Sequence, residues 1–566
     1  MLRLSEIKLS LAEAEKPAIP LQAAAAGILG LTPADILRVD VFKRSFDARK
    51  AELMAVYIVD VEVAPAVDAV LLEKFAGNPH IQPTPDMTWH PPAYAPTNLP
   101  QRPVVVGFGP CGIFAALALA QMGFNPIVLE RGKAVRERTR DTWGLWRKKV
   151  LNPESNVQFG EGGAGTFSDG KLYSQIKDPR HLGRKVMQEF VNAGAPAEIL
   201  YEAHPHIGTF KLVKVVENLR AQIIAMGGEV RFEQRVTDVH IEDGHLRGLT
   251  VRDQASGESR ELAADQVVMA LGHSARDTFT MLHARGVQMQ AKPFSIGFRI
   301  EHPQGLIDRA RWGRHTGHPL LGAADYKLVH HASNGRSVYS FCMCPGGTVV
   351  AATSEPGRVV TNGMSQYSRN ERNANAGIVV GIAPNDYPRD PAAFEAALGP
   401  AFDAPSLRAD APHPLAGIVL QRQLESNAYV LGGSTYEAPG QLVGDFMAGQ
   451  PSTRLGDVAP SYKPGVKLGD LSGALPAYAI AAIREALPAF GRKIRGFDRP
   501  DAVLMGVETR TSSPLKMGRG EDLQSLSVRG LYPAGEGAGY AGGILSAGVD
   551  GIKVAEALAR VIADKA

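Results

Sequence analysis

The sequence predicts an α/β fold of several domains, and three features of its 566 residues carry that prediction. An apolar strand runs into a glycine-rich turn and an alanine-rich helix within 103–131. A second buried strand, within 264–272, ends in glycine, and a third, within 530–563, is followed by a glycine loop and a helix. Strands that alternate with helices in this way form parallel sheets. At about 100–200 residues per domain, the length allows two to four domains.

Residues 1–85 are expected to form a small α+β module. The stretch 18–31 is alanine-rich and predicts a helix that stops near Gly30, while 34–50 and 51–64 have the apolar alternation of strands. Residues 86–102 are dense in proline and predict a linker.

The segment 103–131 has the full context of a dinucleotide-binding βαβ unit. Gly107 permits the tight turn, Gly109 lets the backbone approach a pyrophosphate, and Gly112 lets the helix pack closely. The helix N-terminus offers unpaired N–H groups to phosphate. Glu130 ends the second strand, where a carboxylate accepts hydrogen bonds from ribose hydroxyls and repels a 2′-phosphate.

Later segments divide the chain further. Residues 229–253 predict a β-meander with a hairpin at Asp243-Gly244, and about 290–500 mixes strands and helices without a nucleotide motif. We therefore expect a nucleotide-binding domain in two pieces, 103–290 and 501–566, with a substrate or cap domain, 291–500, between them.

The charge balance argues against a general nucleic-acid-binding protein. Lysine and arginine number 61 against 58 acidic residues, a formal net charge of +3. The densest basic run is 131–149. Two interpretations of this run are open: a solvated helix face, or a collar near an anionic ligand.

Cysteine usage and hydropathy point to the cytoplasm. Three cysteines in so long a chain indicate a reducing compartment. The first residues lack an apolar core of signal-peptide length, and no stretch approaches the ~18 apolar residues of a membrane span. We expect a cytoplasmic protein without a membrane span.

Three strings in order, "GFGPCG", "QVVMALGHS" and "LYPAGEGAG", occupy 107–112, 266–274 and 531–539. Together they resemble the two-dinucleotide-binding flavoproteins of the glutathione-reductase-like superfamily. The resemblance implies non-covalent FAD and a discontinuous Rossmann-like FAD-binding domain with an inserted α+β substrate domain. It also implies that Glu536 holds a flavin ribityl hydroxyl, and that the helix after Gly543 aims its N-terminus at the flavin ring.

Further strings resemble one bacterial family of uncharacterised FAD-dependent dehydrogenases across essentially the whole chain. They are "NVQFGEGGAGTFSDGKL" (156–172), "PHIGT" (205–209), "SFCMCPGG" (340–347), "SEPGRVVTNGMS" (354–365) and "GVETRTSSPLKMGR" (506–519). The first is a glycine-rich loop placed where related flavoproteins wrap the cofactor; a purely structural loop is the alternative.

Motifs and resemblance together give the predicted FAD-binding residues. They are Gly107, Gly109, Pro110, Cys111, Gly112, Glu130, Arg131, Gly162, Gly163, Thr166, Asp169, Gly170, Lys171, Val236, Ala270, Gly272, Gly535, Glu536, Gly543 and Ile544.

Cys342, Cys344 and His206 are the candidate catalytic residues. In an extended strand the two cysteine side chains share a face about 6.6–6.8 Å apart, too far for a disulfide unless the chain turns. Either a thiol lies near the flavin, as proton donor or nucleophile, or both cysteines are small buried hydrophobes. His206 is either an acid/base near the substrate or a structural loop histidine. The sequence contains no pattern that supports a metal site.

These features predict an FAD-dependent oxidoreductase that transfers hydride at the flavin to or from an unidentified small-molecule substrate. The alternatives are a flavin-dependent reductase of activated C=C bonds, an RNA-acting flavoprotein and a redox-silent FAD scaffold. The chain has no second G-x-G-x-x-G module, so NADH or NADPH is expected only as a transient electron donor. A quinone or a protein is a candidate electron acceptor, and the oligomeric state is left open.

Overall fold

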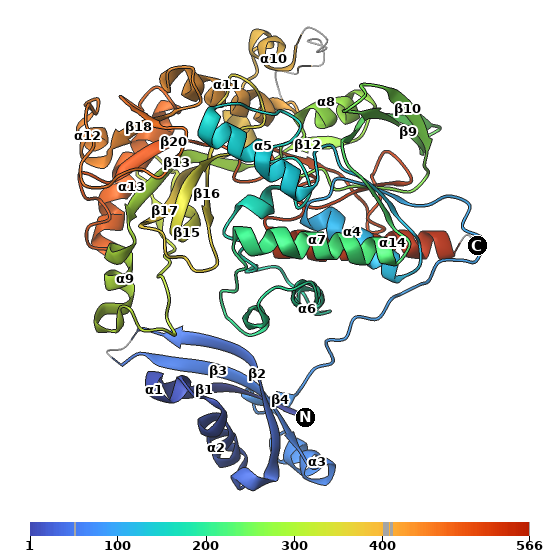
Figure 1. The fold of residues 1–566 in the computed structure, drawn as a ribbon, viewed down its shortest axis with the longest axis vertical. Helices are drawn as coiled ribbons and strands as arrows, with labels where there is room; N and C mark the ends of the chain where they lie inside the picture. Colours follow the sequence, from blue (N-terminus) through green and yellow to red (C-terminus); the bar gives the residue numbers. More distant parts are fainter. Residues whose placement is uncertain (50–51, 400–406, 408–410, 565–566) are drawn as a thin grey trace.

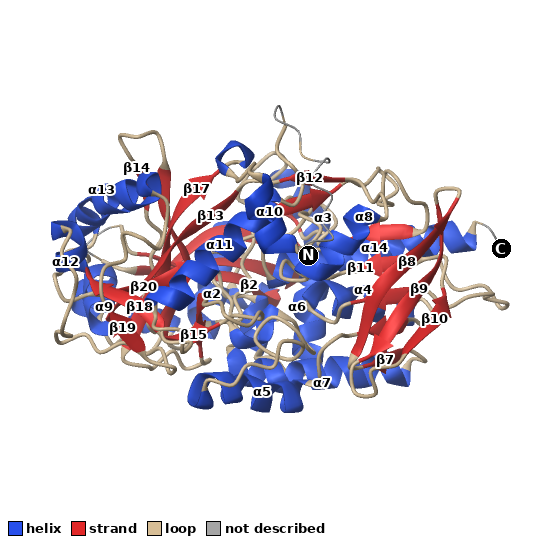
Figure 2. Cartoon of the chain, turned by 90° about the horizontal axis from the view of Figure 1, so that it is seen from above, coloured by secondary structure: helices blue, strands red, loops and turns tan. Residues whose placement is uncertain are grey.

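The computed structural model describes residues 1–49, 52–399, 407 and 411–564. Figure 1 shows a small N-terminal module, in blue, below two larger regions. One of these contains the parallel sheet and the other a long, mostly antiparallel sheet. Seen from above, in Figure 2, the two larger regions lie side by side.

The N-terminal module is an antiparallel sheet in the order β2-β3-β1-β4. Its elements are β1 (Leu2–Ser10), α1 (Leu11–Ala14), α2 (Ala18–Leu29), β2 (Ile36–Asp47), β3 (Met54–Val63), α3 (Pro65–Lys74) and β4 (Ile81–Pro83). This is the ferredoxin-like βαββαβ arrangement. Helix α2 ends where the sequence predicts, because Gly30 takes the left-handed conformation at its C-cap, with φ of +72°.

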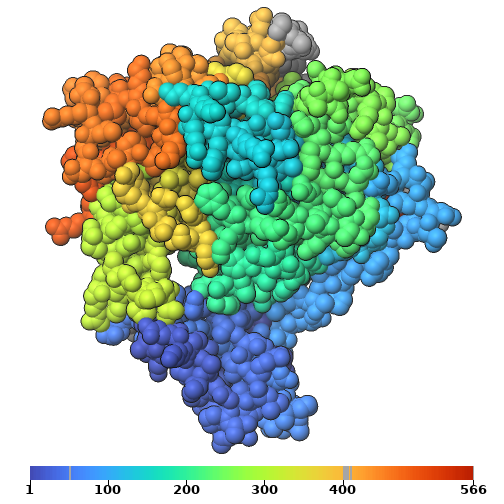
Figure 3. All heavy atoms as spheres, in the orientation of Figure 1, coloured from blue at the N-terminus to red at the C-terminus, as the bar shows by residue number. Residues whose placement is uncertain are grey.

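The module lies against the rest of the molecule (Figure 3). The backbone of Arg44 in β2 exchanges hydrogen bonds with Tyr201 and Ala203. Residues 84–103 then cross to the larger regions without a helix or strand.

The second region is built on a parallel sheet in the order β22-β11-β5-β6-β7. Its strands are β5 (Val104–Val106), β6 (Ile127–Leu129), β7 (Glu229–Arg231), β11 (Val267–Met269) and β22 (Leu531–Pro533). One face packs against helices α4 (Pro110–Gln121), α6 (Leu182–Asn192), α7 (Thr209–Ala225) and α14 (Ile544–Ala563). The fold is therefore mixed α/β, and parallel strands direct their carboxyl ends to one edge.

The opposite face of this sheet packs against an antiparallel meander of β8 (Gln234–Glu242), β9 (His245–Asp253) and β10 (Ser259–Ala263), next to helix α8 (Arg276–Ala284). The meander was expected over 229–253, but it begins only at β8, because 229–231 form β7 and pair with β6 in the parallel sheet. The turn between β8 and β9 falls at Asp243 and Gly244, both with positive φ, as the Asp-Gly pair predicts.

The third region, called the cap below, contains a long sheet in the order β14-β15-β17-β13-β20-β18-β19, with β16 paired to β15. Its strands are β13 (Phe294–Pro303), β14 (Val329–His331), β15 (Ser337–Ala351), β16 (Thr361–Ser365), β17 (Asn373–Ile382), β18 (Ala438–Leu442), β19 (Val466–Leu468) and β20 (Val503–Glu508). Its helices are α9 (Gln304–Trp312), α10 (Pro391–Leu398), α11 (Ala416–Leu431), α12 (Val443–Ala448) and α13 (Ala477–Lys493).

One expected boundary differs from this architecture. The last piece of the nucleotide-binding domain was expected to begin at residue 501, yet β20 pairs with β13 and β18 of the cap sheet. The strand is entirely buried in that sheet. The chain returns to the parallel sheet after β20, through β21 (Leu515–Met517), which pairs with β12 (Met289–Ala291).

Candidate functional site

A cavity of about 370 Å³ lies at the carboxyl edge of the parallel sheet, between that sheet and the cap. This volume is within the ~300–1,000 Å³ typical of ligand pockets. The predicted site residues that line it are Gly107, Gly109, Pro110, Cys111, Glu130, Arg131, Gly163, Asp169, Lys171, Val236, Ala270, Gly272, Glu536, Gly543, Ile544 and Cys342. Motifs far apart in the sequence therefore meet around one space.

Two glycines of the first motif are required by their surroundings. Gly107 has a φ of +96°, and a Cβ atom there would lie 2.2 Å from the carbonyl oxygen of Ala270. At Gly112, a Cβ atom would lie 1.9 Å from the carbonyl oxygen of Gly107. Helix α4 can therefore start directly behind the turn, with Gly109 as its N-cap and no side chain capping it.

Glu130 organises the backbone around this turn. One carboxylate oxygen accepts the N–H of Phe108 at 2.8 Å, and the other accepts the N–H groups of Gly132 and Gly160 at 2.8 and 2.9 Å. The carboxylate thus ties the end of β6 to the first glycine turn and to the glycine-rich loop, while still lining the cavity.

Arg138 of helix α5 (Val135–Lys148) holds the glycine-rich loop in place. Its side chain is fully buried and donates to backbone carbonyls at 2.6 to 3.3 Å. The acceptors are Asn156, Val157, Gly160, Glu161 and Gly163. Burial lowers the pKa of Arg138 to about 10, so it remains a cation at neutral pH.

The basic run 131–149 therefore combines features of a solvated helix face with residues that line or support the cavity. Arg131 lines the cavity and pairs with Glu154 and Asp277, and Arg138 is buried under the loop. Arg140, on the same helix, is exposed as a solvated face requires.

The N-terminus of a second helix, which follows the C-terminal motif, also lines the cavity. Helix α14 starts at Gly543, again without a side-chain cap. A Cβ atom at Gly542 or Gly272 would meet no other residue within 4 Å, so the backbone at both positions is open to the cavity. Glu536 lies beside this end, and burial raises its pKa to about 7 although Lys292 lowers it.

Cys342 and Cys344 both lie in β15, but the strand is not regularly extended there. β15 bulges between Phe341 and Cys344, and Cys342 has a φ of +43°. The Cys342 side chain lines the cavity, whereas Cys344 is completely buried. Both are free thiols, and the Cys344 thiol donates to the carbonyl oxygen of Cys342 at 3.3 Å.

Charged groups from the cap and the glycine-rich loop surround these cysteines. Arg299 donates to Glu508 at 2.9 Å and to the carbonyl oxygen of Cys342 at 2.8 Å. Burial raises the pKa of Glu508 to about 7 even beside Arg299. Lys171 pairs with Asp169 at 2.7 Å and also donates to the carbonyl oxygen of Met343.

His206 lies outside the cavity. Its Nε2 lies 2.9 Å from the carbonyl oxygen of Tyr367, and its ring stacks on the Tyr367 ring. Burial lowers the pKa of His206 to about 4, with Arg369 acting in the same direction. The geometry therefore favours the structural interpretation of this histidine over the acid/base one.

Among the described residues, several other predicted contacts also lie behind the cavity wall. The predicted residues that do not line the cavity are Gly112, Gly162, Thr166, Gly170, Gly535, Cys344 and His206. Thr166 fills the space in which a Cβ atom at Gly162 would lie, and Gly535 packs on Cys111 while donating its N–H to Asp550. Gly170 approaches Gly208 too closely for a side chain. These residues shape the wall and do not face its interior.

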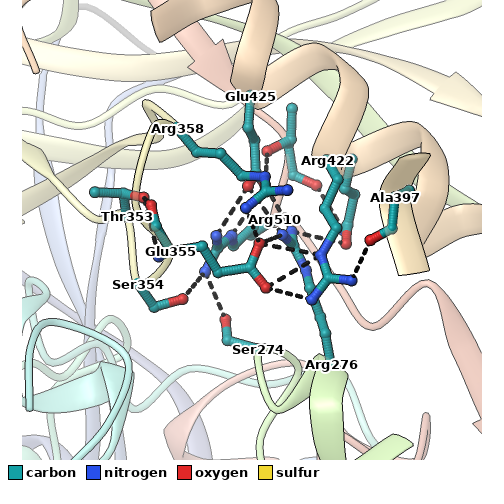
Figure 4. Close-up of polar contacts among 12 residues, drawn as sticks. Ser274, Arg276, Thr353, Ser354, Glu355, Arg358, Ala397, Arg422, Glu425 and Arg510 are labelled. Carbon is teal, nitrogen blue, oxygen red and sulfur yellow. Dashed lines mark hydrogen bonds and ion pairs between the residues drawn. The ribbon is translucent and has the colours of Figure 1, made fainter. Parts of the chain in front are cut away.

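Sequence reasoning missed a buried arginine–glutamate cluster that joins the cap to the parallel-sheet region (Figure 4). Arg276 of α8 and Arg510 both donate to the Glu425 carboxylate of α11, at 2.6 to 3.0 Å. Burial opposes ionisation of Glu425, but the two arginines lower its pKa to about 2. Glu355 joins Arg276 to Arg422. Glu355 and Arg510 fall inside the quoted strings 354–365 and 506–519, which was the available signal.

Neither a metal cluster nor a membrane-spanning helix is found among the described residues. In the described part of the chain, no group of three or more His, Cys, Asp or Glu side chains is placed to hold a metal ion. No helix in that part is long and apolar enough to cross a membrane.

Comparison with known proteins places the chain in a family. Residues 293–511 match the family model described as "FAD-dependent protein, C-terminal domain-like", and residues 1–62 match a domain of unknown function, DUF8436. Over 535 residues, 93% of each chain, the protein is 45% identical to an uncharacterised protein of Clostridium beijerinckii. The chain belongs to this bacterial FAD-dependent family. The membership that the sequence motifs predict is confirmed.

Two solved structures are less similar to this chain in sequence identity than the Clostridium protein is. Quinol fumarate reductase from E. coli is 12% identical, with a TM-score of 0.36 over 82% of this chain and 71% of that one. A geranylgeranyl bacteriochlorophyll reductase-like protein from Thermoplasma acidophilum is 12% identical, with a TM-score of 0.33 over 82% and 79%. Both scores are below 0.5.

The cavity of this FAD-dependent protein fits its family's cofactor on three observations. Two uncapped helix N-termini, at Gly109 and Gly543, reach the cavity and suit negative charge. Glycine backbone lines it where side chains would intrude. Finally, no described residue donates a hydrogen bond to the Glu536 carboxylate, which is free to accept one from a ligand hydroxyl.

Proposed function

We propose that this protein is an FAD-dependent oxidoreductase that exchanges hydride between the flavin and a small-molecule substrate inside the described cavity. The observation that carries the proposal is that residues of the parallel-sheet region and residues of the cap line the same cavity. The glycine turn of α4 lines the same cavity as Cys342 and Glu508 from the cap and Lys171 from the glycine-rich loop. A cofactor cradle thus lies beside groups that can donate, accept or stabilise protons and charge.

The proposed roles follow the lining residues. The turn from Gly107 to Gly109 and the start of α4 would bind the pyrophosphate, and Glu130 and Arg131 would hold the ribose. Glu536 would accept a hydrogen bond from a ribityl hydroxyl, and the start of α14 would stabilise negative charge on the flavin ring. When bound, FAD supplies a two-electron carrier.

The cap side of the cavity would receive the substrate. Lys171 is a half-buried cation there: burial lowers its pKa, but Asp169 and the two cap cysteines together raise it by more, so the pKa lies above its ordinary value. Glu508, with a pKa of about 7, can hold or release a proton near neutral pH. A small anionic or carbonyl-containing substrate suits this pair. NADH or NADPH would enter the same space transiently as the electron donor, and a quinone or protein would be the acceptor.

Anaerobic rapid mixing tests the proposal. The holoprotein is mixed separately with NADH, with NADPH and with a panel of small organic reductants, and the visible absorbance of the flavin is followed. We expect at least one donor to bleach the flavin within seconds and an added quinone or substrate to restore it. A flavin that binds but is neither reduced by the panel nor reoxidised after photoreduction would indicate a redox-silent scaffold.

A further prediction concerns Glu536. Replacing it with glutamine or alanine should weaken FAD binding about tenfold to a hundredfold, because a charge-assisted hydrogen bond contributes roughly 1.5–3 kcal/mol. With a pKa of about 7, Glu536 loses its negative charge as the pH falls below neutral. Wild-type affinity should therefore be lower at pH 6 than at pH 8, and this pH dependence should be smaller in Glu536→Gln.

Fluorescence titration of the apoprotein with FAD measures both effects. Glu508 has a similar pKa and is unchanged in the variant, so the difference between the two proteins isolates Glu536. The exposed Glu521→Gln is the matched control and should bind FAD normally. Equal affinity in Glu536→Gln and wild type at pH 8 would remove the proposed role.

A further inference from the structure

The bulge in β15 places the Cys344 thiol against the backbone of Cys342 at the cavity wall. Cys342 adopts a positive φ, a conformation that non-glycine residues rarely take. The bulge cancels the extended geometry that would separate side chains two residues apart. The Cys344 thiol consequently turns back and donates to the Cys342 carbonyl oxygen.

The two sulfurs differ in access. Cys342 lines the cavity beside Asn362 and Glu508, whereas Cys344 is fully buried behind it. A Cβ atom built at Gly363 would lie 2.9 Å from the Cys344 sulfur, so the glycine makes room for that thiol. One thiol thus faces incoming molecules, and the second lies directly behind it.

The charges favour reaction at the accessible sulfur. The Cys344 thiol, which donates to the Cys342 carbonyl oxygen, lowers the pKa of Cys342, and Lys171 and Arg299 lower it further, whereas burial raises it. Asp169, Glu508 and Glu536 are the acids that oppose ionisation of Cys342, and the first two are paired with Lys171 and Arg299. The pKa of Cys344 is raised correspondingly. Of the two thiols, Cys342 is therefore the one that loses its proton more readily.

We propose that Cys342 and Cys344 form a redox-active dithiol that closes reversibly to an intramolecular disulfide by reaction with a two-electron oxidant in the cavity. The inference deepens the proposed function where that oxidant is the bound flavin. A small disulfide is the other source of the same chemistry. Neither arm requires Cys111, which is buried at the start of α4.

The chemistry balances in both arms. The Cys342 thiolate attacks one sulfur of a small disulfide, the disulfide bond breaks, and one thiolate leaves. Cys344 then loses its proton and attacks the Cys342 sulfur, which releases the second thiolate as the internal disulfide forms. Two protein thiols are oxidised and one disulfide is reduced to two thiols. With the flavin as acceptor, the pair gives up the same two electrons and two protons.

Thiol counting on the full-length holoprotein tests the pair. The protein is equilibrated anaerobically in buffers of reduced and oxidised glutathione, denatured in acid, alkylated and weighed intact. We expect three alkylated thiols under reducing conditions and one under oxidising conditions, because Cys111 stays free. Cys344→Ser should instead accumulate one glutathione on Cys342, and Cys342→Ser should accumulate none. Cys111→Ser, the control, should change from two alkylated thiols to none.

A separate reductive titration tests whether the flavin is the oxidant of the dithiol. Stepwise reduction of the oxidised holoprotein should consume two more electrons per FAD in wild type than in Cys344→Ser. Three alkylated thiols throughout the glutathione series would overturn the dithiol. If the flavin still cycles in that case, the proposed function stands without it. If the disulfide forms in a protein that binds no FAD, the proposed function fails and the dithiol stands.

Discussion

Replacing Arg138 with methionine is expected to abolish FAD retention and to destabilise the protein severely. The fully buried guanidinium is a shared donor to the carbonyls that fix the glycine-rich loop. Each buried carbonyl left without a donor costs about 1–3 kcal/mol, and solvent or backbone relaxation recovers part of this. We expect a loss of about 4 kcal/mol in the free energy of unfolding and at least a hundredfold loss in FAD affinity.

Urea unfolding and FAD titration on the purified variant measure these two quantities. Arg140→Met is the matched control, since Arg140 is exposed on the same helix and its replacement should change neither quantity appreciably. A stable Arg138→Met protein with normal FAD affinity would show that the loop holds its shape without the arginine.

Replacing Gly107 with alanine is the second change with a large expected effect. The new methyl group would lie 2.2 Å from the carbonyl oxygen of Ala270, at a φ of +96° that alanine rarely adopts. β5 and β11 are adjacent in the sheet, so the turn can relieve the clash only by moving. The turn would then lose its position under the pyrophosphate, and we expect FAD binding to fall at least a hundredfold.

Gly27→Ala provides the contrast for this variant. Gly27 lies inside α2, and a Cβ atom there meets no other residue within 4 Å. This change should stabilise the N-terminal module by roughly 0.5–1 kcal/mol through helix propensity and leave FAD binding unchanged. Near-wild-type FAD affinity in Gly107→Ala would show that the first glycine is not required for the cofactor.

The sequence predicted those parts of the fold that depend on local backbone chemistry. Gly30 ends a helix and Asp243-Gly244 makes a hairpin, because left-handed backbone conformations suit these residues. The glycine turn at Gly107 likewise follows from spacing alone. The placement of β20 did not, since nothing within 503–508 states which sheet will pair with it.

Residues of the site could be predicted only where a short motif fixes the local backbone conformation by itself. Arg138 sits in a run of charges that looks like a solvated surface, and only the folded loop reveals its buried acceptors. The bulge at Cys342 and Cys344 could not be predicted, because a bulge depends on the partner strand and leaves no local pattern. His206 was a reasonable acid/base from its chemistry, but long-range packing places it on Tyr367 outside the cavity.

Identification of the bound cofactor tests the central claim most directly. The protein is purified without added flavin, denatured by heat, and the released small molecule is identified by chromatography and mass, with its amount compared with that of the protein. The account predicts FAD, released without covalent linkage, approaching one molecule per chain after reconstitution. Release of FMN or NAD in its place, or a colourless protein that takes up no FAD, would contradict it.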